Sequence, residues 1–126
     1  ELPACAGLKN RIRHSAWSAL RLVAYTGYRN EMPNLLARPH TDRAALTFAL
    51  HESHRGFEVK TPGSELWQHI MPHVNRSIVF GGDALQEISR GAIPALCHRA
   101  RHLEPGTCVR MPILRSAAVY FAFADQ

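Results

Sequence analysis

Apolar residues along the chain fall into short runs, which are separated by segments rich in glycine, proline and asparagine. Runs of this length between turn-forming residues are typical of β-strands. Residues 56–60 also alternate apolar and charged side chains, as a half-exposed strand does. We predict strands at residues 20–25, 44–50, 56–60, 67–70, 77–80, 95–98 and 115–123.

Helical signals are few. Residues 8–19 predict a short basic helix, residues 84–89 predict a helical turn, and the prolines and asparagines of residues 28–39 predict a loop. Short strands about ten residues apart, with one or two short helices, favour an all-β fold of the sandwich or barrel kind. At 126 residues the chain suits one domain, with a tail and short helix at 1–19 and a β core at 20–126.

The pattern His40-Thr41-Asp42 stands directly before an apolar run. If the backbone is extended there, the imidazole and the carboxylate lie on one face and can reach the same ion. A distant histidine, for which His98 is a candidate, would complete an iron site of two histidines and one carboxylate with open positions for substrate and oxygen. With eight histidines and ten acidic residues in 126 positions, such a pair arises by chance in roughly half of similar chains. The rest of the sequence must therefore show whether this pair is part of a metal site.

Charge and cysteine content narrow the possible partners. The chain has a formal charge of +5, but its basic residues are scattered and no nucleic-acid-binding signature is present. We therefore expect a solvated basic surface and no nucleic-acid partner. Three cysteines without CxxC spacing argue against a disulfide framework and favour a reducing compartment, which predicts a cytoplasmic location. No signal peptide or membrane-length apolar run is present, so we expect no membrane partner.

Several landmarks follow one another in a consistent order. They are Leu22-Val23-Ala24-Tyr25, His40-Thr41-Asp42 with Ala45-Leu46-Thr47-Phe48, Gly56-Phe57-Glu58-Val59, Trp67, Ser77-Ile78-Val79-Phe80-Gly81-Gly82-Asp83-Ala84-Leu85, Ser89-Arg90-Gly91, His98-Arg99, and Arg115 ahead of Val119-Tyr120-Phe121. In this order they resemble the catalytic core of the iron(II)- and 2-oxoglutarate-dependent oxygenases, in the isopenicillin N synthase-like branch. The resemblance runs from about residue 20 to 121 and implies a double-stranded β-helix, or jelly roll.

The resemblance also implies roles for individual residues. His40, Asp42 and His98 match the facial triad that holds Fe(II). Arg115 matches the arginine that pairs with the far carboxylate of 2-oxoglutarate, and Tyr25 matches a tyrosine that contacts this cosubstrate in some relatives. The spacing from His98 to Arg115 is longer than usual, so Arg110 is the alternative. We prefer Arg115 because the Val119-Tyr120-Phe121 ending sets the register and a proline interrupts the strand around Arg110.

One position departs from the family pattern. Many relatives carry a serine or threonine two residues after the arginine, and its hydroxyl shares the far carboxylate of 2-oxoglutarate. This chain has Ala117 there, on the same strand face as Arg115. Loss of one such charge-assisted hydrogen bond weakens cosubstrate binding by ~1.5–3 kcal/mol unless water or another side chain compensates.

The activity implied by the resemblance is oxidation of a small organic substrate by dioxygen, most simply a hydroxylation, with release of succinate and CO2. We expect a monomer. The chain begins at Glu1, and relatives have a helical N-terminal half that covers the barrel, so we expect a piece of a longer protein. An alternative is a jelly-roll binding or structural module without turnover. A nucleic-acid demethylase is a third possibility, which no base-stacking or phosphate-binding motif supports.

Overall fold

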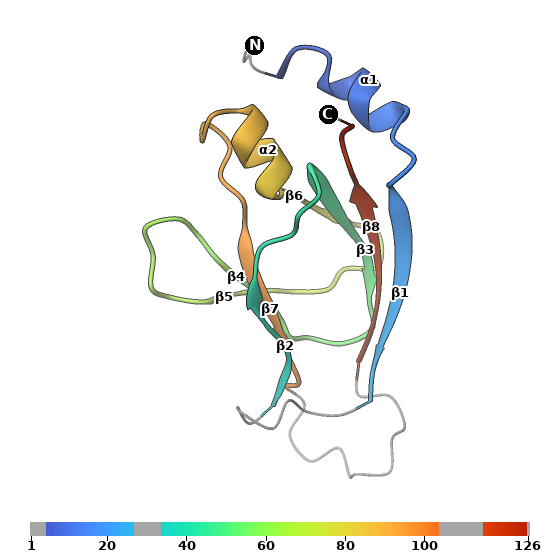
Figure 1. Cartoon of the computed structure of the whole chain (residues 1–126). Coiled ribbons are helices and arrows are strands. Elements are labelled where there is room, and N and C mark those ends of the chain that lie inside the picture. Colours follow the sequence, from blue (N-terminus) through green and yellow to red (C-terminus); the bar gives the residue numbers. More distant parts are fainter. Residues whose placement is uncertain (1–4, 27–33, 104–114, 126) are drawn as a thin grey trace.

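Two antiparallel β-sheets face each other and form the body of the molecule (Figure 1). The computed structural model describes residues 5–26, 34–103 and 115–125. The strands and helices of these residues are α1 (Leu8–Arg13), β1 (Ala19–Tyr25), β2 (Leu35–His40), β3 (Leu46–Glu52), β4 (Phe57–Lys60), β5 (Gln68–Ile70), β6 (Ile78–Gly81), α2 (Asp83–Ile88), β7 (Cys97–Arg101) and β8 (Arg115–Ala122). The predicted all-β class with two short helices is confirmed.

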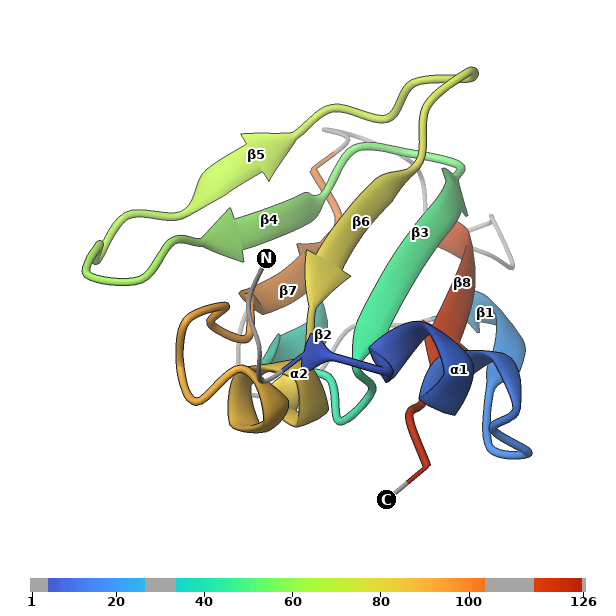
Figure 2. The same ribbon diagram turned by 90° about the horizontal axis from the view of Figure 1, so that it is seen from above.

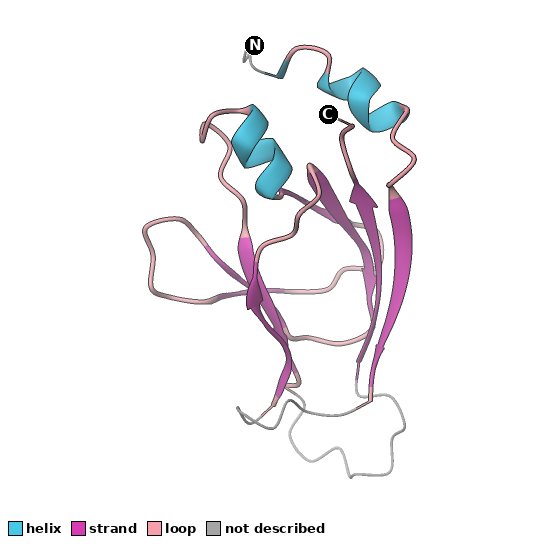
Figure 3. Cartoon of the chain, in the orientation of Figure 1, coloured by secondary structure: helices cyan, strands magenta, loops and turns pink. Residues whose placement is uncertain are grey.

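The strand order shows that the chain winds back and forth between the sheets. One sheet has the order β1-β8-β3-β6 and the other β2-β7-β4-β5, and the neighbouring strands run antiparallel (Figure 2). Strands that are distant in sequence are therefore neighbours, as in a jelly roll. Both helices lie at the same end of the two sheets (Figure 3). In the described part of the chain, neither helix has the length and apolar character needed to cross a membrane.

Strand β2 corrects the predicted loop at residues 28–39. Leu35 and Leu36 are each 2% exposed, whereas Arg38, Pro39 and His40 are exposed, so the strand has only a short apolar start. Its pairing with β7 shifts register twice, and β2 is the edge strand of its sheet. A proline, which has no N–H to donate, is tolerated at such an edge or irregularity. Because proline was taken as a loop signal, residues 35–39 were wrongly predicted to lie in a loop.

Helix α1 is also shorter than predicted, since it ends at Arg13 rather than continuing to residue 19. It has no buried residue, and Trp17 beyond it is 76% exposed. Short helices gain most of their stability from packing of an apolar face, and α1 has little such packing. The Nε of Arg11 donates a hydrogen bond of 2.6 Å to the carbonyl oxygen of Asp125, which ties the helix to the end of the chain.

The core between the sheets is formed by Phe57, Val59 and Phe80, with half-buried Ile70, Ile78 and Leu96 packed against them. On β4, the intervening Glu58 points to the other face of the β2-β7-β4-β5 sheet, yet it is 1% exposed. Its carboxylate pairs with Arg99 of β7 and lies 3.2 Å from Nε2 of His69. Glu58 and Arg99 are register partners, so their ion pair lies on one face of the sheet, and the preceding residue, His98, points to the opposite face, toward the interior.

Gly82 provides a close approach of two backbone segments. A Cβ at this position would overlap the carbonyl oxygens of Asp42 and Ala44, whereas a Cβ at Gly81 would meet the side chains of Ile93 and Leu85 at 3.3 and 3.4 Å. We expect Gly82→Ala to lower the free energy of unfolding by at least the ~1–3 kcal/mol typical of overpacking, because backbone must move. Gly81→Ala, measured beside it by chemical denaturation, is the matched control. Equal midpoints for the two variants would contradict this packing constraint.

Candidate metal centre

Strand pairing brings two histidines together. His40 is the last residue of β2 and His98 lies in β7, and the two are register partners on these neighbouring strands. Their ring centroids are 4.3 Å apart. His98 is 7% exposed, whereas the side chain of His40 is 47% exposed. The pair therefore has one side in the protein interior and one side open.

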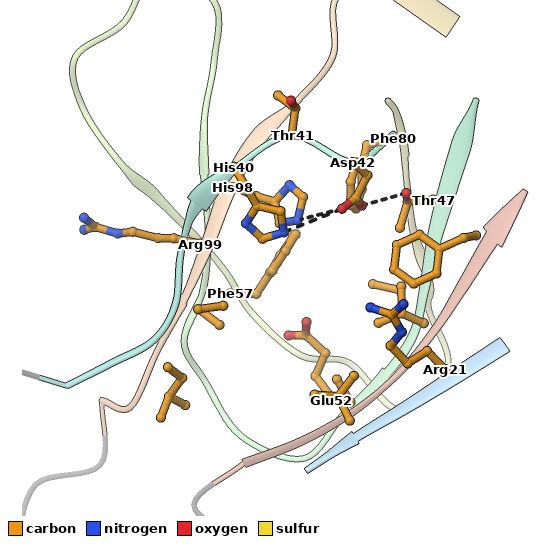
Figure 4. Close-up of a pocket in the computed structure, with 18 of the residues that line it drawn as sticks. Arg21, His40, Thr41, Asp42, Thr47, Glu52, Phe57, Phe80, His98 and Arg99 are labelled. Carbon is orange, nitrogen blue, oxygen red and sulfur yellow. Dashed lines mark hydrogen bonds and ion pairs between the residues drawn. The ribbon is translucent and has the colours of Figure 1, made fainter. Parts of the chain in front are cut away.

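Asp42 completes the group from just beyond the end of β2. Its Oδ1 lies 3.6 Å from Nε2 of His40 and 3.7 Å from Nε2 of His98. The three candidate ligand atoms lie within 4.8 Å of one another, and Figure 4 shows the three side chains converging. Two imidazole nitrogens and one carboxylate oxygen form the donor set of mononuclear non-haem iron sites, in which the three ligands occupy one face of the metal and leave the other positions open.

Backbone carbonyl groups orient both imidazole rings. Nδ1 of His40 lies 2.7 Å from the carbonyl oxygen of Arg38, and Nδ1 of His98 lies 3.0 Å from that of Leu96. A carbonyl oxygen can only accept, so each Nδ1 is the donor in its hydrogen bond. The Nε2 atoms, on the other side of each ring, lie toward Asp42. This second layer of contacts is what a metal-binding histidine requires.

Burial favours the neutral form of His98. Removal from water lowers the pKa of His98, while the hydrogen bond to Leu96 and the nearby Asp42 act in the opposite direction. Its ring packs against Phe57 and Phe80, with centroid distances of 5.5 and 4.9 Å. A neutral imidazole has the free lone pair that a metal ion needs, whereas an imidazolium has none.

Thr47, to which the sequence analysis gave no functional role, supports the carboxylate. Its Oγ1 donates a hydrogen bond of 2.7 Å to Oδ2 of Asp42, which leaves Oδ1 directed at the two histidines. Thr47 is 1% exposed and lies on β3. A polar hydroxyl within a buried strand, five residues after the carboxylate, was the available sequence signal. The backbone N–H of Asp83 also donates to the carbonyl oxygen of Asp42, at 2.7 Å.

We expect Thr47→Val to weaken Fe(II) binding by about 10–100-fold, the usual effect of losing a supporting contact to a ligand. Valine has nearly the same shape as threonine but cannot donate to Asp42. Thr47→Ser, which keeps the hydroxyl, is the control. Anaerobic equilibrium dialysis against Fe(II) measures both variants, and an unchanged affinity of Thr47→Val would show that the contact does not position the carboxylate.

A cavity of about 780 Å³ extends from the triad between the two sheets. Arg115 and Tyr25 line the same cavity and are register partners on β8 and β1. The guanidinium carbon of Arg115 lies 5.5 Å from the centroid of the Tyr25 ring, and Arg115 is 2% exposed. The structure thus places the two predicted cosubstrate residues in one space with the triad. The alternative, Arg110, lies outside the described residues.

One protein family, described as the 2OG-Fe(II) oxygenase superfamily, matches residues 16–123, a segment that includes the triad and Arg115. The chain belongs to this superfamily. Its solved relatives include an oxygenase from Shewanella oneidensis, with a TM-score of 0.73, 25% identity, and coverage of 90% of this chain and 41% of that one. The jelly-roll prediction agrees with this likeness.

Two further structures of the superfamily fold were solved with the cosubstrate. A full-length protein of Neurospora crassa in complex with α-ketoglutarate has a TM-score of 0.68 and 25% identity, covering 86% of this chain and 34% of that one. The Arabidopsis thaliana dioxygenase for auxin oxidation, in a binary complex with 2-oxoglutarate, has a TM-score of 0.72 and 22% identity, covering 86% and 39%. The latter identity supports a common fold only.

Curated relatives match shorter segments. The chain is 30% identical over 74 residues to a bifunctional coumaroyl-CoA and feruloyl-CoA ortho-hydroxylase of Ipomoea batatas, which covers 59% of this chain and 21% of that protein. It is 37% identical over 65 residues to a 2-oxoglutarate-dependent dioxygenase of Arabidopsis thaliana, covering 52% and 16%. The chain therefore spans about one fifth of the length of the curated relatives it matches.

The residues present fit the cofactors of the superfamily. The predicted Fe(II) suits the two imidazoles and one carboxylate, and the predicted 2-oxoglutarate suits a cavity that holds a buried arginine beside this metal centre. Family membership and the donor set together confirm both cofactor predictions.

Glu52 is a further cavity residue that the sequence analysis missed. Its side chain is 6% exposed, and its Oε1 lies 2.6 Å from Nη2 of Arg115. Strand β3 has a register shift between Ala49 and His51, so Glu52, rather than His51, follows Thr47 and Ala49 in lining the cavity. Figure 4 shows Glu52 across the cavity from the triad. Burial raises the pKa of Glu52, although the Arg115 guanidinium acts in the opposite direction.

Proposed function

We propose that this chain is the catalytic core of a non-haem Fe(II)- and 2-oxoglutarate-dependent dioxygenase that hydroxylates a small organic substrate, with release of succinate and CO2. The observation that carries the proposal is the His40, Asp42 and His98 group, whose Nε2 and Oδ1 atoms converge at the wall of a cavity that also contains Arg115. Membership of the 2OG-Fe(II) oxygenase superfamily supports it.

Each of these residues has a defined task in the proposed mechanism. His40, Asp42 and His98 would hold Fe(II), which supplies the activation of dioxygen when bound. Arg115 would bind the far carboxylate of 2-oxoglutarate with its planar guanidinium, which lies over the ring of Tyr25. Phe57 and Phe80 pack around His98 and keep water away from its buried side.

The substrate belongs to the same proposal. We assign the chain to the isopenicillin N synthase-like branch, with a small organic substrate and dioxygen as partners. We also propose that the protein is a cytoplasmic monomer and has no nucleic-acid partner. The Ipomoea batatas relative is named as a hydroxylase of coumaroyl-CoA and feruloyl-CoA, and one structure of the Neurospora crassa protein contains thymine. These names support a substrate with an unsaturated ring.

The test separates binding from turnover. Fe(II) and 2-oxoglutarate are added to the protein without oxygen, and we expect the weak visible absorption band of the metal–cosubstrate chelate. Oxygen and ascorbate are then added with a panel of small aromatic acids, and succinate is measured. Absence of both the band and succinate would contradict the proposal.

A binding module without turnover is the second candidate, and Glu52 is the observation that favours it. Its carboxylate already contacts the guanidinium that the cosubstrate would use, and Ala117 provides no hydroxyl beside it. This candidate predicts that metal is bound while succinate stays at the background level with every substrate tested. Succinate release above that background would exclude it.

A further inference from the structure

Glu52 and Arg115, which line the cavity, carry buried polar atoms that lack hydrogen-bond partners in the described part of the chain. Among the described residues, Oε2 of Glu52 and both Nε and Nη2 of Arg115 are buried without a hydrogen bond. The 2.6 Å contact between Nη2 and Oε1 of Glu52 is an ion pair, and it leaves Oε2 of Glu52 and Nε of Arg115 without a partner within residues 5–26, 34–103 and 115–125. Buried polar atoms are costly when unpaired, so this group is built to be completed by a ligand.

Strand register places Glu52 beside the missing hydroxyl. Ala117 is the register partner of Glu52 on β3 and also of Val23 on β1, and all three side chains line the cavity. Neither the Ala117 nor the Val23 side chain can donate a hydrogen bond. Because directly opposed side chains in a sheet are neighbours, the carboxyl group of Glu52 lies next to the position where a serine or threonine hydroxyl would be.

The charges in the site determine whether Glu52 can bind a carboxylate as an ionised or as a protonated group. A bound dicarboxylate would bring a second negative group to the one guanidinium of Arg115, in a site removed from water. Two carboxylates that share such a site cannot both stay ionised without a large cost, so one of them takes up a proton. Burial already raises the pKa of Glu52, although Arg115 and His51 act in the opposite direction, and this favours Glu52 as the group that takes up the proton.

We propose that Glu52, as a neutral carboxyl group, donates its O–H to the far carboxylate of 2-oxoglutarate and thereby replaces the hydroxyl that is missing at position 117. This inference rests on the proposed function. Arg115 and Glu52 then bind the same carboxylate from two strands, as an arginine and a serine on one strand do in relatives. Cosubstrate binding is accompanied by the uptake of one proton wherever Glu52 is ionised in the ligand-free protein.

The proposal predicts a distinctive dependence on pH. Above the pKa of Glu52, affinity for 2-oxoglutarate falls by up to tenfold per pH unit, because each binding event must take up a proton. Other groups around the cavity also titrate or carry charge, so a matched variant has to isolate Glu52. The groups that line the cavity are Arg115 on β8, Tyr25 and Arg21 on β1, Arg99 on β7, Arg38 and Arg43 on either side of the metal-binding segment, and His40, Asp42 and His98; His51 is adjacent to Glu52 on β3.

The test is calorimetric titration of the anaerobic, Fe(II)-saturated protein with 2-oxoglutarate, across a pH series and in two buffers of different ionisation enthalpy. We expect wild type to take up a proton at the upper end of the series. Glu52→Gln, whose amide donates without titrating, should bind at least tenfold more tightly there and show no such uptake. Ala117→Ser is a second variant, which restores the hydroxyl and should also reduce uptake. Glu65→Gln, the same change at an exposed site, should match wild type.

The outcomes separate this inference from the proposed function. If wild type binds 2-oxoglutarate and Glu52→Gln shows the same affinity, slope and proton uptake, the inference is wrong while the oxygenase proposal stands. If binding and proton uptake are as expected but succinate is never released, the proposed turnover alone fails. If the metal-loaded protein does not bind 2-oxoglutarate at any pH, both are overturned.

Discussion

Replacing His40 with alanine is expected to abolish stoichiometric Fe(II) binding while leaving the fold nearly unchanged. The side chain of His40 is 47% exposed, so its removal opens little space in the core. It nevertheless supplies one of three ligand atoms, and its loss should cost more than the 10–100-fold that loss of a supporting contact costs. Equilibrium dialysis under argon, followed by metal analysis, measures the binding.

His98→Ala should abolish Fe(II) binding as well, but it should also destabilise the metal-free protein. The buried ring packs against Phe57 and Phe80, and deletion of a buried side chain of this size costs roughly 2 kcal/mol or more. His73→Ala, at an exposed position outside the cavity, is the control for both measurements. Normal Fe(II) binding by His40→Ala would show that the triad is not the metal site. The contrast between the two ligand variants separates ligation from packing.

The strands that sequence patterns predicted well have either an apolar run or a regular alternation of apolar and charged residues. The segments at 20–25, 56–60 and 115–123 correspond to β1, β4 and β8, with ends that differ by one residue. Strand β2 was missed because only Leu35 and Leu36 are buried there, and Pro39 imitates a loop. An edge strand needs few apolar residues, since much of its surface faces water, so its pattern is weak.

The three candidate metal ligands could be predicted from the sequence, but the presence of Glu52 in the cavity could not. His40, Asp42 and His98 belong to a motif order that is readable in the sequence, and the three side chains do lie together, although the pairing of β2 with β7 that joins the two histidines was not predicted. Glu52 was hidden because strict alternation from Thr47 and Ala49 would place His51 in the cavity. The register shift in β3 reverses that alternation, and a single sequence gives no sign of such a shift.

The second large effect is expected at Arg115. Arg115→Ala should raise the concentration of 2-oxoglutarate needed for half-saturation by tenfold to more than a hundredfold, since each charge-assisted hydrogen bond is worth about 1.5–3 kcal/mol. Arg110→Ala is the comparison, because the sequence offered it as the alternative. Calorimetric titration of the Fe(II)-loaded protein gives the affinities. A larger effect for Arg110→Ala would mean that the assignment of the cosubstrate arginine is wrong.

The interpretation of Arg115→Ala has to account for Glu52, because the substitution leaves a buried carboxylate without its cation. Breaking a buried ion pair on one side costs roughly 3–5 kcal/mol, so the single variant could lose affinity simply by unfolding. The double variant Arg115→Ala with Glu52→Gln removes the unpaired charge and should recover much of the stability. It should still bind 2-oxoglutarate weakly, since a glutamine amide cannot replace a guanidinium. Recovery of stability without recovery of affinity assigns the loss to the cosubstrate contact itself.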